Sequence, residues 1–558
     1  MLNADRARSL ILLFLALLFV TPTVFALDLN EITWNASGKG GAVAAEGKKA
    51  VAAGISMLEQ GGNAADAAAA TLLALSITDY GKYAIGAEIP LIIYDAKTAE
   101  VKVLCGLGSA PLDPKAIEWY YKNGIPGRGG IKAAPVPGAI SLCVATVRLY
   151  GTMTFEQVVT PTLRLLDAGG KDWYDELAVT LRKLVETERA TTGSREEKLQ
   201  AARDRFYKGD IADELVKFYK KNGGFLSKKD LMSHVTRVED PVKVQYRGYT
   251  IYKCDSWTQG PYLCQTLRIL EGFDLKKMTH LSADYIHVLT EALKLGMADR
   301  DEYYGDPLFA DVPMKALLSD RYTELRRPLI DMQKASKEIR PGDPVNMKAV
   351  KDRPGTYRPG PGGTTTCVVA DRLGNMVAAT PSGNRPYAIC HELGIAHGNR
   401  LRSLNTTPNH PNRIEPGKRP RITLTPTIVL KEGKPAIGIS VAGGDLQDQT
   451  TLNCLLNVIE FGMMPKDAVT APRFYTGHHQ DSFNPNPNRR KTMKGLGSLW
   501  LNNRVDKKVQ AELTRRGHKV RTTGQSIARP VMIVIDHDTG MMHAAGDHRW
   551  GRHAAALR

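Results

Sequence analysis

Residues 361–371 read Pro-Gly-Gly-Thr-Thr-Thr-Cys-Val-Val-Ala-Asp, and the rest of the chain is organised around them. The tract before them, residues 331–363, is polar and rich in proline and glycine, which predicts a loop. The apolar run 367–370 predicts a short strand, and residues 371–375 predict a hairpin turn into a second strand over 376–380. Thr364 therefore stands where a loop becomes a buried strand.

Cleavage of the bond between Gly363 and Thr364 would place a hydroxyl and a free α-amine on one residue. Such an amine has an unperturbed pKa of about 7.7–8, so it accepts the hydroxyl proton near neutral pH. An N-terminal threonine activated by its own amine is an established kind of nucleophile. The simpler interpretation, a threonine-rich start of a strand, stays open on these residues alone.

Length and composition indicate a globular protein. A chain of 558 residues predicts two lobes or one large layered domain, and 43% hydrophobic and 24% charged residues are ordinary globular values. The net charge of +17 is spread along the chain. A solvated surface is the simplest explanation of this charge. Attraction to an anionic substrate, membrane or cell-wall polymer is the alternative. No motif supports nucleic-acid binding.

The first 26 residues have the pattern of a secretory signal peptide. Arg6 and Arg8 precede the apolar run 10–20, and Val24-Phe25-Ala26 offers a small-residue cleavage site. The apolar run is short for an uncleaved membrane anchor, and no later segment is apolar enough to span a bilayer. We therefore expect a periplasmic or secreted protein. Its seven cysteines lack C-x-x-C spacing; such a compartment permits a disulfide, but the odd count leaves at least one thiol unpaired within the chain and the pattern identifies no pair.

The order of predicted elements favours a layered α/β fold in which both halves share one core. Helices are expected over 48–60, 63–75, most of 138–219, 281–301, 450–461 and 507–516. Strands are expected over 42–45, 90–94, 101–105, 243–252 (a pair), 367–370, 376–380, 425–430, 436–441 and 531–536.

Several short motifs, kept in order over some 500 residues, resemble the γ-glutamyltransferases, which are secreted N-terminal-nucleophile hydrolases made as self-cleaving precursors. The motifs are Gly61-Gly62-Asn63-Ala64-Ala65-Asp66-Ala67-Ala68, Val136-Pro137-Gly138, Tyr246-Arg247-Gly248-Tyr249, Ala298-Asp299-Arg300, Lys418-Arg419-Pro420 and Ala471-Pro472-Arg473-Phe474. The resemblance implies an αββα sandwich built jointly by a large subunit, residues 27–363, and a small catalytic subunit, residues 364–558. It implies no cofactor and no metal.

The resemblance also implies roles for individual residues. Thr364 takes the place of the nucleophile, with Gly363–Thr364 as the self-cleaved bond, and Ser382 matches the hydroxyl residue that assists processing. Gly443 and Gly444 match the oxyanion-hole glycines, which suits the need for unobstructed backbone N–H donors. The substrate-binding positions are Asn384, Thr423 and Asp445.

Other positions depart from the family pattern. Leu107 stands where the family has an arginine that binds the substrate carboxylate, and leucine cannot form a bidentate salt bridge. The acidic pair that binds the substrate α-ammonium falls near Arg402-Ser403, and the early glycine-rich turn is reduced to Ala84-Ile85-Gly86-Ala87-Glu88. We therefore expect Arg400 and Arg402 to engage a carboxylate, with a solvated loop as the alternative.

These observations predict a self-processing amidohydrolase or acyltransferase that acts on a small amide or peptide, such as a γ-glutamyl compound, as a heterodimer of its own two pieces. One alternative is an amidase for a non-glutamyl anionic amide, and another is a non-catalytic binding protein that keeps the fold. A metal hydrolase using His478, His479 and Asp481, or His537, His543 and His548, is the least supported, because neither set has the helical spacing of a zinc site.

Overall fold

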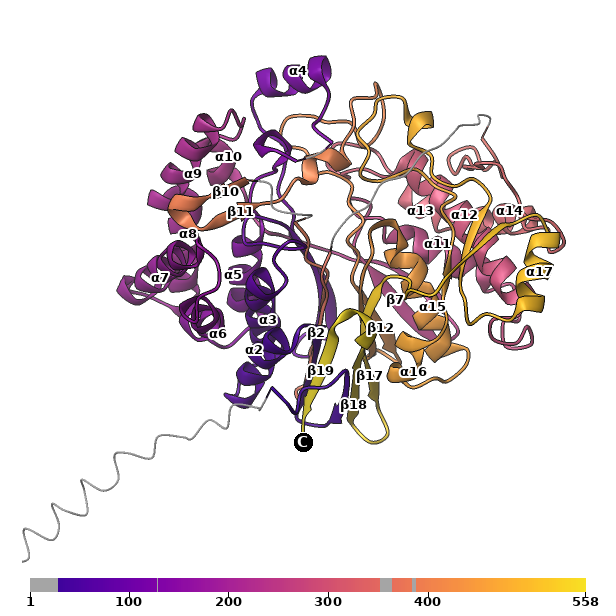
Figure 1. The fold of residues 1–558 in the computed structure, drawn as a ribbon, viewed down its shortest axis with the longest axis horizontal. Helices are drawn as coiled ribbons and strands as arrows, with labels where there is room; N and C mark the ends of the chain where they lie inside the picture. Colours follow the sequence, from indigo (N-terminus) through magenta and orange to yellow (C-terminus); the bar gives the residue numbers. More distant parts are fainter. Residues whose placement is uncertain (1–28, 128, 352–363, 384–387) are drawn as a thin grey trace, which may run out of the picture.

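The computed structural model describes residues 29–127, 129–351, 364–383 and 388–558, so the signal-peptide prediction, Gly363 and Asn384 lie outside the described residues. Two seven-stranded sheets face each other, and helices cover the outer face of each (Figure 1). The layers are therefore helix, sheet, sheet and helix, which confirms the predicted αββα sandwich.

The first sheet is antiparallel throughout and places β8 near its centre. Its strand order is β19 (Arg552–Leu557), β2 (Gly41–Glu46), β8 (Cys367–Asp371), β9 (Met376–Ala379), β3 (Ile89–Asp95), β4 (Glu100–Gly106) and β5 (Arg237–Glu239). Because β8 and β9 lie between β2 and β3, segments from both sides of Thr364 alternate within one sheet.

The second sheet is also antiparallel, and it mixes the two halves in the same way. Its order is β1 (Asn35–Gly38), β18 (Met541–Gly546), β17 (Arg529–Asp536), β13 (Lys434–Ala442), β12 (Thr427–Lys431), β7 (Tyr249–Lys253) and β6 (Val242–Tyr246). The expectation that both halves share one core is confirmed.

Strand β8 shows why its sequence is a continuous apolar run. Cys367 and Val369 pack into the core under the helices, whereas Val368 and Ala370 pack into the core between the sheets. Alternate side chains of a strand point to opposite faces, so a strand buried on both faces must be apolar at every position.

The helices form two separate outer layers. Those on the first sheet are α2 (Lys48–Glu59), α3 (Ala64–Thr78), α5 (Ala139–Tyr150), α6 (Phe155–Asp167), α7 (Tyr174–Ala190), α8 (Arg195–Lys208), α9 (Asp210–Lys221) and α10 (Lys228–Ser233). Those on the second are α11 (Pro261–Leu270), α12 (Ala283–Tyr303), α13 (Met314–Leu317), α14 (Asp320–Arg326), α15 (Gln447–Ile459), α16 (Pro465–Thr470) and α17 (Lys507–Arg515). A further helix, α4 (Pro114–Asn123), projects from one end (Figure 1).

Helix α3 illustrates how the family motif acts structurally. Asn63 accepts from the backbone N–H groups of Ala65 and Asp66, and Asp66 accepts from the N–H of Asn63, which together form a capping box. Asp66 also accepts from the backbone and hydroxyl of Thr152. These bonds satisfy the buried start of a helix that contacts β8.

The predicted helices and strands are confirmed with shifts of a few residues at their ends; for example, the strand expected from 425 begins at Thr427. Several elements were not predicted, among them β19 and the small sheet of β14 (Phe474–Tyr475), β15 (Ser498–Asn502) and β16 (Lys519–Thr523). A further hairpin joins β10 (Ala388–Cys390) to β11 (Ile395–His397). All seven cysteines are buried and free. Within the described residues, no helix is both long and apolar enough to cross a bilayer.

Candidate active site

Thr364 lies just before β8 and is only 2% exposed. Its hydroxyl donates to Ser382 Oγ at 3.5 Å, the outer limit of a hydrogen bond. The neighbouring Thr365 N–H donates to the carbonyl of Pro381 at 3.0 Å, which holds the start of β8 beside the segment that follows β9. The structure thus brings together the two hydroxyl residues that were predicted from the sequence.

Ser382 is held by a short extension of the first sheet. Its backbone N–H donates to the carbonyl of Glu88 at 3.0 Å, and the N–H of Glu88 donates back at 3.2 Å. This bridge lies just beyond the β3–β9 pairing. Glu88, which the sequence analysis did not assign to the site, therefore lies directly beside Ser382.

Arg400 connects the side chains of these two residues. Its Nη2 donates to Ser382 Oγ at 2.8 Å, and its Nε donates to Glu88 Oε1 at 2.6 Å. The side chains of Arg400 and Glu88 are each 1% exposed. Burial raises the pKa of Glu88, and the Arg400 guanidinium opposes that shift. Arg400 was predicted to engage a carboxylate; its Nε and Nη2 donate to protein groups, and its Nη1 has no hydrogen-bond partner among the described residues.

Arg402 lies on the same short turn, η4 (Arg400–Ser403), and points to a different partner. Its Nη1 donates to the carbonyl of Gly127 at 3.1 Å. Both guanidinium groups lie over the ring of Phe483, Arg402 at 4.9 Å and Arg400 at 5.5 Å from the ring centroid. These distances allow cation–π attraction, so one buried ring holds both cations.

The glycine turn follows β13, the strand opposite β8 and β9. Gly444 has φ of +60°, a left-handed conformation that favours glycine, and it opens η5 (Gly444–Leu446), which leads directly into α15. A Cβ on Gly444 would lie 3.1 Å from the ring of Phe483. Phe483 therefore contacts both arginines and closely approaches this turn.

Asp445 is anchored by a buried network. It accepts from Arg300 Nη1 at 2.9 Å and from Ser482 Oγ at 2.5 Å, and Lys494 Nζ lies 3.5 Å away. Burial alone would raise the pKa of Asp445, but the nearby charges of His479, Arg300 and Lys494 outweigh it and lower the pKa. The carboxylate predicted to bind substrate is thus committed to protein groups in this structure.

The two parts of the site lie at the same end of the facing sheets. Thr380, just after β9, and Ser440, near the end of β13, have their hydroxyl oxygens 2.9 Å apart. Ser382 follows the first and Gly443 follows the second within a few residues. The nucleophile candidate and the glycine turn are therefore brought together from opposite sheets.

Two other predicted positions are buried. Thr423 is fully buried, and its hydroxyl has no hydrogen-bond partner among the described residues. With its amide turned to donate, Gln447 bonds the carbonyl of Thr423 at 2.9 Å. Leu107 is 3% exposed and packs in the core between the sheets. An apolar side chain thus stands where the resemblance places a carboxylate-binding arginine.

Three of the five histidines considered as metal ligands lie against backbone carbonyls, and His543 Nδ1 lies 2.8 Å from Ser37 Oγ. His478 Nε2 lies 2.9 Å from the carbonyl of Glu338, His479 Nδ1 lies 2.7 Å from that of Gln480, and His537 Nε2 lies 2.8 Å from that of Pro435. No group of three or more histidine, cysteine, aspartate or glutamate side chains in the described part of the chain could hold a metal ion.

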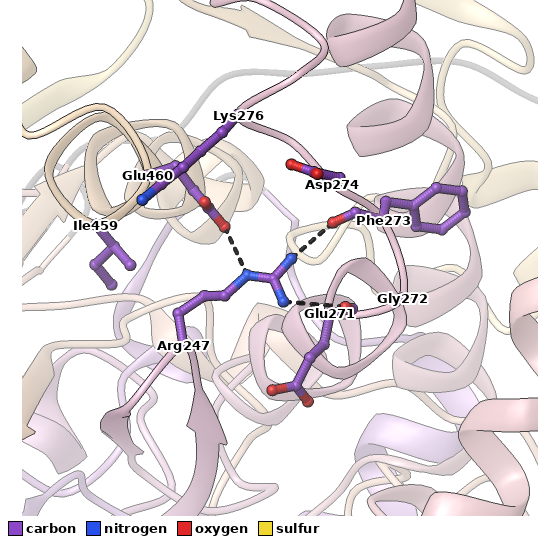
Figure 2. Close-up of a pocket in the computed structure, with 8 residues that line it drawn as sticks. All are labelled: Arg247, Glu271, Gly272, Phe273, Asp274, Lys276, Ile459 and Glu460. Carbon is purple, nitrogen blue, oxygen red and sulfur yellow. Dashed lines mark hydrogen bonds and ion pairs between the residues drawn. The ribbon is translucent and has the colours of Figure 1, made fainter.

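A cavity of about 440 Å³ lies beside the turn between β6 and β7 (Figure 2). Arg247 spans it, donating to Glu460 Oε1 at 3.1 Å and to the carbonyls of Phe273 and Glu271 at 2.7 and 3.2 Å. None of the predicted site residues lines it. The Tyr-Arg-Gly-Tyr motif therefore joins a hairpin to the ends of α11 and α15.

Sequence reasoning missed three residues of the site: Glu88, Arg300 and Phe483. Glu88 had a usable signal, because a lone carboxylate beside the apolar run 89–93 needs a partner. Arg300 lay within a recognised motif, but nothing indicated its contact with Asp445. Phe483 had no local signal, since its role depends on three segments that meet only in the folded chain.

Two facing antiparallel sheets between helical layers, with a threonine at the start of a central strand, define the class of N-terminal-nucleophile hydrolases. The crystal structure of cephalosporin acylase from Bacillus halodurans superimposes with a TM-score of 0.77 at 25% identity, covering 94% of this chain and 97% of that one. The sequence also matches the family described as Gamma-glutamyltranspeptidase over residues 50–183 and 173–557. The chain belongs to the γ-glutamyltranspeptidase family.

Curated relatives carry two kinds of name. The glutathione hydrolase proenzyme of Bacillus subtilis (strain 168) is 29% identical over 563 residues, which cover 93% of this chain and 92% of that protein. The acylase ACY 1 proenzyme of Pseudomonas sp. (strain SE83) is 29% identical over 532 residues, covering 87% and 88%. The chain is accordingly an enzyme, an amidohydrolase of this family.

Proposed function

We propose that the chain cleaves its own Gly363–Thr364 bond and then uses Thr364 as an N-terminal nucleophile. The observation that carries this proposal is the place of Thr364: buried at the start of a central strand, with its hydroxyl 3.5 Å from Ser382 Oγ. The interleaved sheets support it further, because residues 27–363 and 364–558 would stay together after the cut.

The chemistry proceeds through esters in both stages. In processing, Thr364 Oγ attacks the Gly363 carbonyl, its hydroxyl proton passes to the peptide nitrogen, which leaves as the α-amine of Thr364, and water hydrolyses the resulting ester. In turnover, Thr364 Oγ attacks the substrate amide while its α-amine takes the proton and passes it to the leaving amine. Backbone N–H groups of Gly443 and Gly444 stabilise the oxyanion, a contribution of about 3–4 kcal/mol per donor. Water or an amine acceptor then releases the acyl group.

We infer that the acyl group carries a carboxylate and lacks an α-ammonium. Glu88, beside Ser382, and Asp445, at the glycine turn, are each paired with a buried arginine, so neither is available to hold an ammonium group. Arg402 stands near the position of the family's acidic pair, and it is suited to accept a carboxylate. Thr423 and Asn384 are proposed as the polar contacts that complete this site. One relative is named a glutathione hydrolase and another an acylase, so the family is not limited to proteins named for glutathione.

N-terminal sequencing of the purified protein tests the processing step. We expect two polypeptides, one beginning at Thr364, and a single uncleaved chain for Thr364→Ala. Thr364→Ser keeps a hydroxyl and serves as the matched control that should still be cut. A wild-type chain that remains whole, or a Thr364→Ala variant that is still cleaved, contradicts the proposal, and an intact inert chain favours a binding protein.

Two p-nitroanilides that differ only in one amino group test the acyl group. Glutaryl-p-nitroanilide carries the carboxylate alone, whereas γ-glutamyl-p-nitroanilide adds the α-ammonium. We expect kcat/KM to favour the glutaryl compound by at least tenfold. Preference for the γ-glutamyl compound would return the enzyme to the ordinary specificity of its family.

We also propose that residues 1–26 direct export, so that the enzyme works in a periplasm or outside the cell. The support is the sequence pattern of basic residues, apolar run and small-residue site. Cell fractionation of the full chain and of a chain lacking residues 2–26 tests this. Equal cytoplasmic retention of both would contradict it.

A further inference from the structure

We propose that Arg400 and Glu88 form a buried ion pair that positions Ser382 against Thr364, and thereby supports the nucleophile. This inference rests on the proposed function, since it assigns two residues to the same site. It moves Arg400 from substrate recognition to the support of the reacting threonine, and it adds Glu88, to which the sequence analysis gave no role. Both are positioning residues, because they act through Ser382.

The contacts form one continuous chain. Glu88 Oε1 accepts from Arg400 Nε at 2.6 Å, Arg400 Nη2 donates to Ser382 Oγ at 2.8 Å, and Ser382 Oγ lies 3.5 Å from Thr364 Oγ1. The backbones of Glu88 and Ser382 are also paired in both directions. Glu88 thus fixes Ser382 twice, once through the main chain and once through the arginine.

Because the ion pair is buried, its two charges cannot be separated without a large cost in free energy. A guanidinium and a carboxylate that are each 1% exposed must stay together, because either one alone would be a buried unpaired charge. The two segments concerned, residues 84–88 and 400–403, are also two of the places where the sequence departs from its family. The structure shows that these two segments meet in one ion pair, Arg400 with Glu88.

The direction of the hydrogen bonds determines what the pair does. A serine hydroxyl has one proton and two acceptor sites; Arg400 donates to one acceptor site, and the Thr364 hydroxyl donates to the other at 3.5 Å. The cation fixes the position of Ser382 Oγ and makes its proton more readily shared. As Thr364 Oγ loses its proton during attack, Ser382 becomes a fixed donor beside it. The pair should therefore affect self-cleavage and kcat, while leaving KM nearly unchanged.

A different role for Arg400 predicts a different result. If its guanidinium bound the substrate carboxylate, its loss would raise KM and leave self-cleavage unaffected, because no substrate takes part in processing. The two roles are separated by comparing the rate of precursor conversion with the KM of the mature enzyme.

The test uses the full chain with Glu88→Gln and Arg400→Met combined, which removes both charges at once and avoids a buried unpaired charge. We expect a melting temperature close to wild type, self-cleavage slowed at least tenfold, kcat lowered at least tenfold, and KM within twofold. Kinetics use whichever of the two p-nitroanilides the wild type hydrolyses. Arg402→Met, on the same turn and over the same ring, is the matched control: it should raise KM and process at the wild-type rate.

Arg400→Lys keeps the positive charge but loses the planar guanidinium that donates to Glu88 and Ser382 at once. It should recover part of the lost rate of self-cleavage and part of kcat, and it provides a second measurement if the double variant does not fold. Processing at the wild-type rate in the double variant, or a rise in KM with unchanged kcat in either variant, overturns the inference. An uncut wild-type chain would instead overturn the proposed function itself, so the two failures are distinguishable.

Discussion

Two buried arginine–carboxylate clusters support opposite sides of the candidate site, and they differ in how well the carboxylate is satisfied. Glu88, behind the nucleophile, pairs with Arg400, and its Oε2 has no hydrogen-bond partner among the described residues. Asp445, behind the glycine turn, has Arg300, both donors of Ser482, and Lys494 nearby. Both carboxylates are almost fully buried.

The pKa shifts of the two carboxylates run in opposite directions. At Glu88 the cost of burial exceeds the attraction of Arg400, so the pKa is raised. At Asp445 the several positive groups exceed the cost of burial, so the pKa is lowered. A buried carboxylate stays favourably charged only where enough donors replace its lost water. The carboxylate at the glycine turn is therefore stabilised by several charged and polar groups, whereas the carboxylate beside the nucleophile depends on its ion pair with Arg400.

Removing the Asp445 carboxylate should have the largest effect on stability. Asp445→Ala leaves Arg300 buried beside Asp301 alone and removes the anchor of the glycine turn. We expect a loss of about 3–5 kcal/mol in the free energy of unfolding. Chemical denaturation in the uncut Thr364→Ala background measures it on one chain. Asp445→Asn, which keeps the shape, should cost less, and an equal cost would show that charge is not what matters.

Removing the Glu88 charge should destabilise the fold less. Glu88→Gln leaves Arg400 without its counter-charge, but it keeps an acceptor for Arg400 Nε and removes a carboxylate whose charge is already disfavoured by burial. We expect about 1–3 kcal/mol by the same measurement. A loss larger than that of Asp445→Ala would reverse the proposed difference between the two clusters.

Asp445 and Glu88 should contribute to the pH dependence of stability with opposite signs. The folded pKa of Asp445 is lowered, so its contribution is present above its unfolded pKa of about 3.9 and is lost as the pH falls through the folded pKa. The folded pKa of Glu88 is raised, so its contribution is present below its unfolded pKa of about 4.3 and is lost as the pH rises through the folded pKa. We therefore expect the free energy of unfolding, measured from pH 3 to 7, to rise less steeply with pH at the acid end in Asp445→Asn than in the wild type. In Glu88→Gln it should rise more steeply than in the wild type. Identical profiles would contradict both assignments.

The smallest expected effect comes from the glycine turn itself. Gly444→Ala places a Cβ at a φ of +60° and 3.1 Å from the ring of Phe483. Gly462 is the matched control, because its φ is +64° and a Cβ there would meet nothing within 4 Å. We expect each alanine to cost about 1–2 kcal/mol in stability, and only Gly444→Ala to lower kcat. A fall in kcat of equal size in both variants would exclude a local role for this turn.

The sequence predicted most of the fold because its signals are local. The apolar runs of β8 and β9, the capping box before α3 and the periodicity of α12 each depend on residues close in the chain. Strand β19 was missed, since its alanine-rich residues show no alternation of apolar and polar side chains. The β14–β15–β16 sheet was missed because its strands are short and separated by irregular segments.

The residues of the candidate site were predicted only in part. Thr364, Ser382 and the two glycines were found from motifs whose residues are close in the chain, and the structure places them at one end of the facing sheets. Arg400 was found, but its partner was not. Glu88 lies more than 300 positions away from it, and a contact between such distant residues leaves no local pattern.

The amino-acid sequence by itself determined the family, the layered fold and the threonine proposed as nucleophile, because each depends on residue type and short-range spacing. Only the tertiary structure decided which charges meet: Arg400 with Glu88, Arg300 with Asp445, and both arginines of the turn with Phe483. The physical reason is burial. Once water is excluded, each charge needs a partner from whichever strand, loop or helix the fold brings beside it.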